Sequence, residues 1–375
     1  MTPGSELADS FHIESHEALL QRPAAAGISR RPLDAIIVPT IRPALLPAAV
    51  GLASELGCAL VVLCSTPEQA GQVLAECGPA PDDTLVTHVS PALDATLLSF
   101  LASGHPEIDV APSCHGDIAR KRNVGLLLAR LCGWQAIMYL DDDIRDLTAS
   151  AVSWAADLTT CFQAASFRIG YYPDNSVVCH AHRLSGGQQD ILPGGSALVV
   201  DVARCETVFP PVYNEDWLFL FDAVRSRSVA VAGTLSQLEY QPFAHARRAA
   251  SEEFGDVLAE GLYRLIHEGA AVTDATSAYW RDVLERRFQL IDHVAARLLM
   301  AGGSASLTGS ALMSLAAARK RLAAISPLAC VSFVRAWQAD LDAWRHTLRD
   351  LPLVGDLADA AKFLDLPLPD RCVSQ

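Results

Sequence analysis

The stretch "CHGDIARKRNVGLLLARLCGWQAIMYLDDD" (114–143) contains the features that decide the fold. Its first part predicts a helix capped by Asp117, because an acidic residue there precedes apolar residues at helical spacing. The run AIMYL (136–140) predicts a buried strand, and Asp141, Asp142 and Asp143 follow it at once. Polar residues fill the early turns of this helix and leucines face the core: Arg120, Lys121, Arg122 and Asn123, then Leu127, Leu128 and Leu131.

The same alternation of helix and strand runs through the first half of the chain. Short apolar or β-branched runs occur at 34–39, 59–64, 84–89 and 136–140, and segments with helical spacing separate them at 43–56, 67–77 and 118–132. Such a βαβ pattern implies an α/β fold with a mostly parallel sheet flanked by helices. Further strands are predicted at 166–172, 176–182, 196–201 and 229–234, with a helix beginning near Glu215.

The two ends of the chain differ from this central region. Residues 1–31 lack sustained periodicity and predict a flexible N-terminal arm with one short helix near 14–21. Residues 32–250 form the predicted catalytic α/β domain. From 251 to 375 apolar residues recur every three to four positions, which predicts a helical C-terminal region.

Composition excludes several classes of function. The 375 residues include 29 Lys plus Arg against 43 Asp plus Glu, a formal charge of −14, and no basic block, so we expect no nucleic-acid partner. The ten cysteines are scattered without metal-site or disulfide-framework spacing, which favours a reducing cytoplasm. No apolar run approaches the roughly 20 residues of a spanning helix, so we expect a protein without a transmembrane segment.

The three aspartates at 141–143 predict a cation site. In open α/β sheets ligands bind beyond the carboxyl ends of the strands, which is where these aspartates lie. Carboxylate oxygens suit Mg²⁺ or Mn²⁺, and such an ion typically bridges to substrate phosphates. The structural alternative is a solvated acidic turn or a helix start, where carboxylates interact well with the helix dipole.

Two other motifs share these letters. Asp142, Asp143 and Asp146 spell the D-D-x-x-D pattern of prenyl-diphosphate enzymes, but that pattern belongs on a helix, and a strand precedes it here. An aspartyl phosphotransferase requires D-x-D-x-[TV], and Arg145 occupies the last position.

The stretch resembles the GT-A glycosyltransferases, in particular the family 2-like enzymes. Their Arg-Asn-x-Gly, apolar helix, Gly, and strand ending in D-x-D are matched by Arg122, Asn123, Gly125, Gly133 and 141–143. The resemblance implies a metal-dependent transferase that uses a nucleotide-diphosphate sugar.

The resemblance also assigns roles within the donor site. It implies that Asp141 faces the ribose and that Asp143, with His245, holds Mg²⁺ or Mn²⁺. Nucleotide-binding roles fall to the remaining candidates, of which the first two lie in the loop after "IIVP": Thr40, Arg42, Arg122, Asn123 and Asp142.

The acceptor side is expected at "NEDWLFLF" (214–221). In the family an acidic pair here lies beneath the acceptor, which implies that Asp216 is the general base and that Glu215, the second catalytic candidate, orients the acceptor or caps the helix. A sugar hydroxyl is a poor nucleophile, so a carboxylate must take its proton, and an inverting transfer follows. The alternative is an acidic helix cap, because Asn214 followed by two acidic residues suits a helix start.

The pair His180 and His182 in "CHAH" would share one face of a strand, as zinc ligands can, but further ligands at usual spacing are missing, which favours a structural pair. The signature and membrane spans of processive synthases are missing too, so we expect transfer of a single sugar. A mutase or nucleotidyltransferase of the same fold and a non-catalytic nucleotide-sugar-binding scaffold stay open. The helical tail either completes the acceptor pocket or forms a homodimer contact.

Overall fold

Four runs of aliphatic and β-branched residues form parallel strands at the positions expected from the sequence. They are β1 (Ala35–Thr40), β2 (Ala59–Cys64), β3 (Thr84–His88) and β4 (Ala136–Leu140). The structure is a computed structural model. It describes residues 16–24, 27–76, 81, 83–95, 98, 115–172, 175–188, 194–301 and 304–368.

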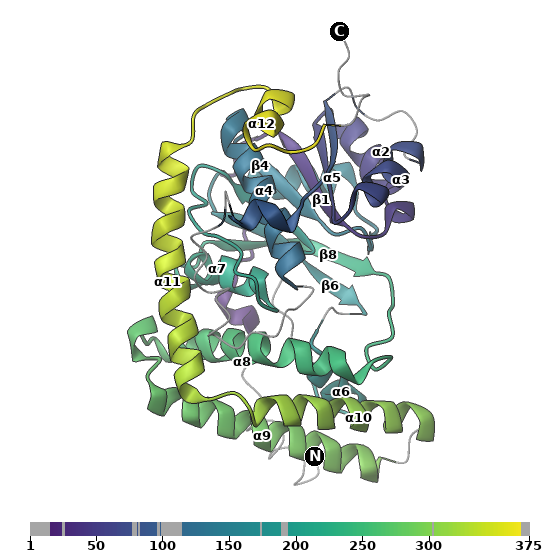
Figure 1. Ribbon diagram of the computed structural model, residues 1–375, viewed down its shortest axis with the longest axis vertical. Coiled ribbons are helices and arrows are strands. Elements are labelled where there is room, and N and C mark those ends of the chain that lie inside the picture. The colour runs from purple at the N-terminus through teal and green to yellow at the C-terminus, as the bar shows by residue number, and fades with distance from the viewer. Residues whose placement is uncertain are drawn as a thin grey trace.

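The described strands form one eight-stranded sheet in the order β3-β2-β1-β4-β7-β6-β8-β5. Its other members are β5 (Ile144–Arg145), β6 (Ala164–Tyr171), β7 (Ala197–Asp201) and β8 (Val229–Gln237). β7 pairs antiparallel with β4 and β6, and β5 pairs antiparallel with β8, while the other pairings are parallel. The predicted mostly parallel α/β fold is confirmed (Figure 1).

Alternate residues of each central strand enter two separate hydrophobic cores. In β1, Ile36 and Val38 belong to a core that also contains Leu52 and Val152, whereas Ile37 belongs to the core on the opposite face. This follows from the period-two alternation of side chains in a strand. The sheet is therefore covered on both faces, which explains why its strands are apolar throughout.

The helices of the first two thirds follow the expected α/β order. They are α2 (Pro47–Leu56), α3 (Pro67–Glu76), α4 (His115–Cys132), α5 (Ala149–Leu158), α6 (Val177–Leu184) and α7 (Glu215–Arg225). Short 3₁₀ turns are η1 (His16–Leu19), η2 (Pro43–Leu45), η3 (Pro91–Ala95) and, later in the chain, η5 (Val272–Asp274).

Two expectations about these elements were wrong. The segment 176–182 is not a strand but the start of α6, capped by the Ser176 hydroxyl, which accepts a hydrogen bond from the Cys179 N–H. Its β-branched residues Val177 and Val178 tolerate a helix because both are buried in the core. Asp117 does not cap α4, since the helix begins at His115 and places Asp117 within its first turn.

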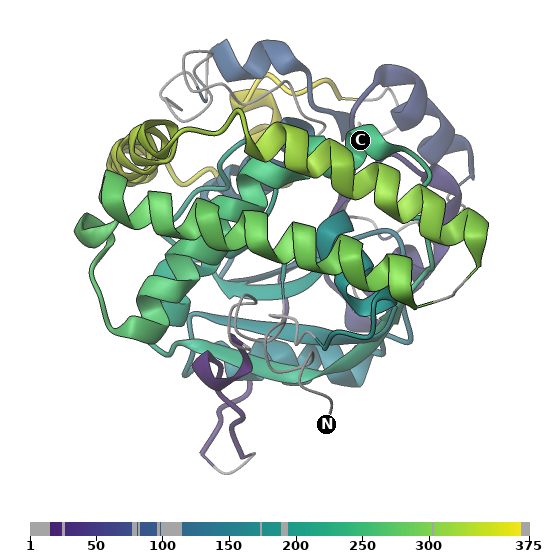
Figure 2. The ribbon, with the colours of Figure 1, turned by 90° about the horizontal axis from the view of Figure 1, so that it is seen from below.

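The C-terminal region is helical in its described residues, as predicted. Its elements are α8 (Ala246–Glu268), α9 (Ser277–Met300), α10 (Ala305–Leu322), α11 (Pro327–Asp350) and α12 (Leu357–Phe363). Seen from below, α9 and α10 lie across α8 as a lower layer (Figure 2), and α11 runs up the side of the molecule (Figure 1). Trp280, Trp337 and Trp344 are buried in the same hydrophobic core as Ile37.

The end of this region returns to the first half of the chain. The Val354 N–H donates to the Leu131 carbonyl of α4 at 2.7 Å, and α12 packs against α4. The Thr87 hydroxyl of β3 donates to the Pro367 carbonyl at 2.7 Å. The last described residues therefore fasten the helical region to the sheet.

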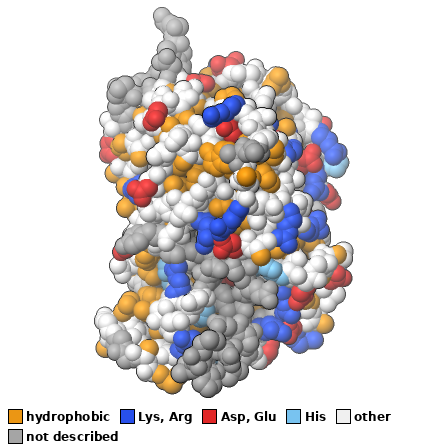
Figure 3. Space-filling model, turned by 180° about the vertical axis from the view of Figure 1, so that it is seen from behind, with side chains coloured by type: hydrophobic (Ala, Val, Ile, Leu, Met, Phe, Trp, Pro, Cys, Tyr) orange, Lys and Arg blue, Asp and Glu red, His pale blue; other side chains and the backbone are white. Residues whose placement is uncertain are grey.

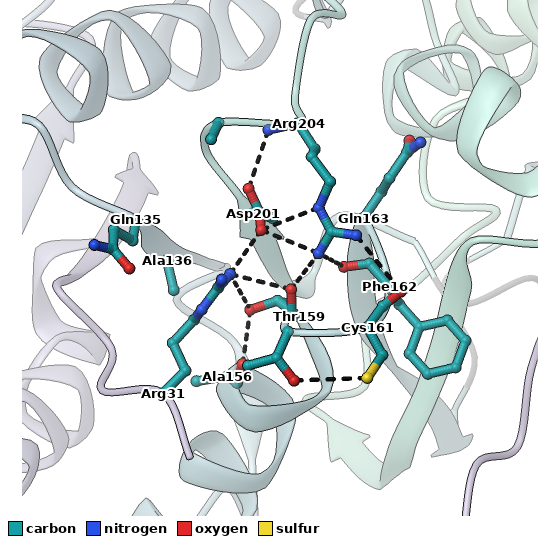
Figure 4. Close-up of polar contacts among 12 residues, drawn as sticks. Arg31, Gln135, Ala136, Ala156, Thr159, Cys161, Phe162, Gln163, Asp201 and Arg204 are labelled. Carbon is teal, nitrogen blue, oxygen red and sulfur yellow. Dashed lines mark hydrogen bonds and ion pairs between the residues drawn. The ribbon is translucent and has the colours of Figure 1, made fainter. Parts of the chain in front are cut away.

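Part of the expected N-terminal arm is packed against the sheet. Leu19 is buried, and Gln21 forms a bridge to Ala230 in β8. Arg31 donates to Asp201 at 2.7 Å, and Arg204 also binds Asp201 in the network of Figure 4. Residues 1–15 and 25–26 of the expected arm lie outside the described residues.

This polar network lies where β7 ends and connects three parts of the chain. Burial opposes the charge on Asp201, but Arg31 and Arg204 outweigh it and lower the pKa of this carboxyl below its ordinary value. Arg31 also donates to the Thr159 carbonyl at 3.0 Å, just after α5. The network stabilises the end of the sheet at which β4 begins, since β7 is antiparallel to β4.

The surface carries mixed charge. On the face opposite that of Figure 1, basic and acidic side chains alternate along one border rather than forming separate fields (Figure 3).

Among the described residues, no single helix has both the length and the apolar character to cross a membrane. The pair α10 and α11 meets those criteria only jointly, with a bend of 80° between its members.

Candidate active site

Four strand ends meet at one edge of the sheet and carry the predicted residues. β1, β4 and β8 run parallel in the sheet, so their carboxyl ends share this edge with the start of the antiparallel β7. After β4 the Asp141 N–H donates to the Ser196 carbonyl at 2.8 Å, and Ile144 then pairs with Gln237 of β8. The aspartates 141–143 therefore occupy a tight connection held from both sides.

Asp142 and Asp143 converge on a single cationic group. One guanidinium nitrogen of Arg42, Nη2, contacts Oδ1 of Asp142 and lies 2.9 Å from Oδ2 of Asp143. The Thr40 hydroxyl donates to the second Asp142 oxygen at 2.6 Å. The two carboxylates are almost entirely buried, whereas 47% of the Arg42 side chain is exposed.

The electrostatics of this group favour a bound cation. Burial alone would lower the pKa of Arg42, but Asp142 and Asp143 outweigh it and raise the pKa above its ordinary value. Two buried carboxylates that share one partner retain oxygen lone pairs for further ligands. Their hard oxygen atoms are those that Mg²⁺ and Mn²⁺ prefer, so Asp142 and Asp143 fit a divalent ion.

Arg122 connects the aspartates after β4 to the acidic start of α7. Its Nη1 donates to Oε1 of Glu215 at 2.6 Å, and its Nη2 donates to Oδ1 of Asp141 at 2.9 Å. The side chain is buried, and although burial opposes its charge, the three neighbouring carboxylates Asp141, Glu215 and Asp216 raise the pKa of Arg122. Arg122 is therefore a permanent buried cation between two acidic groups.

The two acidic residues at the start of α7 have different environments. Glu215 is buried, and this burial raises its pKa to about 8, although Arg122 acts in the opposite direction. Asp216 is only partly buried. Its Oδ2 accepts from the Gly195 N–H at 2.6 Å and its Oδ1 accepts from the Trp217 N–H at 2.9 Å, so backbone groups fix its orientation.

The loop before β7 owes this close approach to its two glycines. A Cβ atom at Gly194 would lie 2.4 Å from Oδ2 of Asp216, and one at Gly195 would lie 2.6 Å from Nη1 of Arg122. Any side chain at either position would displace a charged group of the site. The Gly-Gly pair is thus part of the active-site geometry.

Two residues that the sequence analysis assigned no role also lie here. Lys121 is buried, and its ammonium lies 3.0 Å from the Thr40 carbonyl, 2.7 Å from the Ser65 hydroxyl and 2.7 Å from Asp117. Gln237, at the end of β8, donates to Asp143 at 3.4 Å. For Lys121 the available sequence signal was its position beside Arg122 in one turn of the predicted helix. For Gln237 the sequence held no signal.

Asn123 and Gly125 serve the packing of α4. The Asn123 amide donates to the Phe209 carbonyl at 2.8 Å and accepts from the Phe209 N–H at 2.9 Å, so it fixes the chain after β7. A Cβ at Gly125 would lie 2.8 Å from Ile37, which shows how closely α4 approaches β1. No described contact joins Asn123 or Gly125 to the aspartates at 141–143.

The histidines do not gather at the aspartates. His245 is exposed at the N-terminal cap of α8, and the described contacts do not join it to Asp143. His180 and His182 lie in a helix, so the expectation of one shared strand face was wrong. Burial, then Arg183 and Arg248, lower the pKa of His180 to about 3, which keeps this ring neutral.

A second acidic group lies among the helices. Within the described residues, Cys179 of α6 and Asp256 and Glu260 of α8 bring potential ligand atoms within 4.8 Å of one another, and all three are buried. Asp256 already pairs with Arg287, which lies 2.8 Å from Glu253 as well. This group is therefore part of a buried ion-pair network between α8 and α9.

No protein-family model and no curated protein matches this chain. Among solved structures, it is similar to a mannosyltransferase from Pyrobaculum calidifontis in complex with GDP-Man and Mn²⁺. The two share 14% sequence identity with a TM-score of 0.40, over 89% of this chain and 91% of that one. Because the TM-score is below 0.5, the function of this chain has to be inferred from its own site.

Proposed function

We propose that this protein is a GT-A-type glycosyltransferase. It moves one sugar from a nucleotide-diphosphate sugar to a hydroxyl acceptor, with a divalent ion and with inversion at the anomeric carbon. The observation that carries this proposal is the pairing of two acidic groups at one sheet edge. Asp142 and Asp143 share one cation, Arg42, and Arg122 joins Asp141 to Glu215, the neighbour of Asp216.

The donor side is built for a diphosphate. Asp142 and Asp143 would hold Mg²⁺ or Mn²⁺, which would offset the negative charge of the departing nucleoside diphosphate. Arg42 is half exposed and attached to the site by its tip, so its guanidinium is able to turn toward an incoming phosphate. Thr40 holds Asp142 in place, and Asp141 faces the ribose.

The acceptor side is built for proton removal. Asp216 is the general base: its two backbone hydrogen bonds fix its orientation, while each carboxylate oxygen keeps a free acceptor position. As the acceptor oxygen bonds to C1, its proton passes to Asp216 and the C1–O bond to the diphosphate breaks. The electron pair of that bond leaves with the nucleoside diphosphate, and because the acceptor attacks from the opposite face, C1 is inverted.

Glu215 and Arg122 serve this reaction by position. Glu215 is buried against Arg122 and is held there at 2.6 Å, so it orients the guanidinium rather than the acceptor. Arg122 in turn binds Asp141 and so fixes the position of the donor side relative to the acceptor side.

A thermal-shift panel of UDP-, GDP- and dTDP-sugars with and without MnCl₂ tests the class. One nucleotide family should raise the melting temperature only when Mn²⁺ is present, because ligands that bind the native state stabilise it by mass action. The Asp143→Asn variant should lose this response. Exposed Asp146 in the same segment is the matched control, and Asp146→Asn should retain it. A donor response that is equal with and without metal in the wild-type protein would contradict the metal role.

A further inference from the structure

Helix α8 packs against α7, whose first turn carries the proposed base Asp216 (Figure 1). A Cβ at Gly255 would lie 2.1 Å from the Tyr213 carbonyl oxygen, so α8 touches the backbone of the turn before α7 directly. One residue further in each segment, the Asn214 amide donates to Oδ1 of Asp256 at 3.1 Å. The chain just before the base is thus fixed to α8 by backbone packing and by a side-chain hydrogen bond.

Asn214 adopts a backbone conformation that few residues tolerate. It is the N-cap of α7 with φ 60° and ψ 34°, in the left-handed region, and such a conformation persists where the surrounding structure holds it. Its side chain makes no capping hydrogen bond to α7 and instead donates to Asp256. Arg287 of α9 contacts the other oxygen of Asp256, so the atom that accepts from Asn214 is itself held in place.

Tyr263 of α8 holds the chain on the other side of the base. Its hydroxyl donates to the Trp217 carbonyl at 2.8 Å, and the centroids of the two rings lie 5.0 Å apart. Burial, and then the charge of Asp216, raise the pKa of the Tyr263 hydroxyl well above its ordinary value, so this group stays a hydrogen-bond donor. Asp216 therefore lies between two residues, Asn214 and Trp217, that α8 holds.

We propose that Asp256 and Tyr263 are positioning residues for the general base Asp216. This inference rests on the proposed function, in which Asp216 takes the acceptor proton. The N–H groups of Gly195 and Trp217 orient the Asp216 carboxylate, while α8 holds the backbone that carries it. A base must lie within hydrogen-bond reach of the acceptor oxygen, and a displacement of about 1 Å can cost roughly 10²-fold in rate. The helical region thus contributes to the reaction through the backbone of α7.

Two pairs of substitutions separate positioning from general stability. Tyr263→Phe and Tyr279→Phe each remove one hydrogen bond from a phenol to a backbone carbonyl. The Tyr279 hydroxyl donates at 2.6 Å to Gly261, which lies within α8 and is not part of the turn. Asp256→Ala removes the acceptor for Asn214, whereas Asp256→Asn keeps an oxygen that can accept the same hydrogen bond.

Asn214→Gly tests this hydrogen bond from the side of the turn. Glycine adopts the left-handed conformation without strain, so the variant loses the contact to Asp256 while the turn keeps its shape. It keeps the test decisive if Asp256→Ala does not fold.

Two measurements are made on each full-length variant. The first is release of nucleoside diphosphate, with water as the acceptor, from whichever UDP-, GDP- or dTDP-sugar stabilises the wild-type protein with Mn²⁺. The second is hydrogen exchange of the backbone amides at 213–217, followed by mass spectrometry, which reports on the turn without any substrate.

We expect kcat to fall about tenfold or more in Tyr263→Phe, Asp256→Ala and Asn214→Gly, while the donor KM changes by less than about twofold. Tyr279→Phe should keep the wild-type kcat, and Asp256→Asn should keep most of it. Exchange at 213–217 should accelerate only in the variants with a lowered kcat. Tyr263→Phe and Tyr279→Phe should lower the melting temperature by similar amounts, because each loses one hydrogen bond.

Three results would overturn the inference. Wild-type kcat in Tyr263→Phe and Asn214→Gly, with a strong loss in Asp216→Asn, would leave the base in place and remove the positioning role. Equal losses of kcat in Tyr263→Phe and Tyr279→Phe would assign the effect to stability alone. Wild-type turnover in Asp216→Asn would remove the base itself, and with it the proposed mechanism and this inference together.

Discussion

Nη1 of Arg122 lies 2.6 Å from Oε1 of Glu215, across 93 residues of sequence, and the two side chains are buried. The contact joins α4 to the start of α7. Removing either side chain leaves the other buried without its partner, which is costly. The pair therefore makes the integrity of the fold and the geometry of the site depend on the same residue.

Above about pH 8, where Glu215 is ionised, Arg122→Met should destabilise the protein by about 3–5 kcal/mol, the usual cost of leaving a buried charge without its partner. Arg122→Lys should recover part of this loss, because it restores the charge but not the fork that reaches Glu215 and Asp141 together. Denaturant unfolding measures both. Arg225→Met, at a pair with Asp222 that is about half exposed, should change stability by less than about 1 kcal/mol. An equal effect of the two methionine substitutions would contradict the buried-pair account.

Glu215 should make stability fall as pH rises from about 5 to about 8. The unfolded carboxyl ionises near its model value of 4.5, whereas burial keeps the folded one protonated up to about 8. Over that interval the native state binds more protons than the unfolded state, so raising the pH favours unfolding. Glu215→Gln should remove this contribution, and its stability relative to the wild type should improve steadily toward pH 8 in urea titrations. Glu55→Gln, at an exposed site on α2, should show no such trend.

Asp216→Asn should keep donor affinity while turnover falls by about 10²–10⁴-fold, the usual contribution of a positioned base. Donor affinity is measured by calorimetry and turnover by release of nucleoside diphosphate. Asp222→Asn on the same helix is the control and should turn over normally. Product NMR should show inversion at C1. A retained configuration, or full turnover in Asp216→Asn, would assign the base elsewhere.

Arg42→Gln should tighten Mn²⁺ binding in the absence of nucleotide and weaken nucleotide binding in the presence of Mn²⁺. The guanidinium that contacts Asp142 and Asp143 competes with the ion in the free protein, and it is half exposed and able to reach a phosphate once displaced. Calorimetry with MnCl₂ alone, then with the nucleotide found in the thermal-shift panel, gives both constants. A change of the same sign in both would contradict this exchange.

A chain ending at Arg248 should be insoluble or inactive. Removing residues 249–375 exposes the large side chains of α7 that α8 and α11 cover, among them Phe221, which contacts Trp337 edge-on at 5.7 Å. Exposed apolar surface of this extent drives aggregation. Soluble expression with full turnover would show the helical region to be dispensable.

The sequence was sufficient for the elements whose signals are local. β1 to β4 are bounded β-branched runs, and Asp141 follows directly after one of them, so their positions could be predicted within a residue or two. α6 was mistaken for a strand because its Val-Val start outweighed the capping signal of Ser176. Tertiary burial decides such short segments.

The contacts of the site that the sequence did not predict were missed for a different reason. Gln237 reaches Asp143 across 94 residues of sequence, through the pairing of β8 with β5. The Arg42 contact to Asp142 spans 100 residues. Arg42 was already a candidate through its loop, but no spacing or motif predicts either contact, so only the folded arrangement of the strands shows them.

The hydrogen bond from Thr87 to the Pro367 carbonyl spans 280 residues. At ribosomal rates of about 5–20 residues per second, the partner of Thr87 emerges roughly 15 to 55 seconds after it. For most of that interval the nascent α4, which bears Arg122, lacks the segment at Val354 that later covers its end. A stalled or prematurely terminated chain would therefore expose an unfinished α/β half to chaperones and proteases, whatever the quality of its first strands.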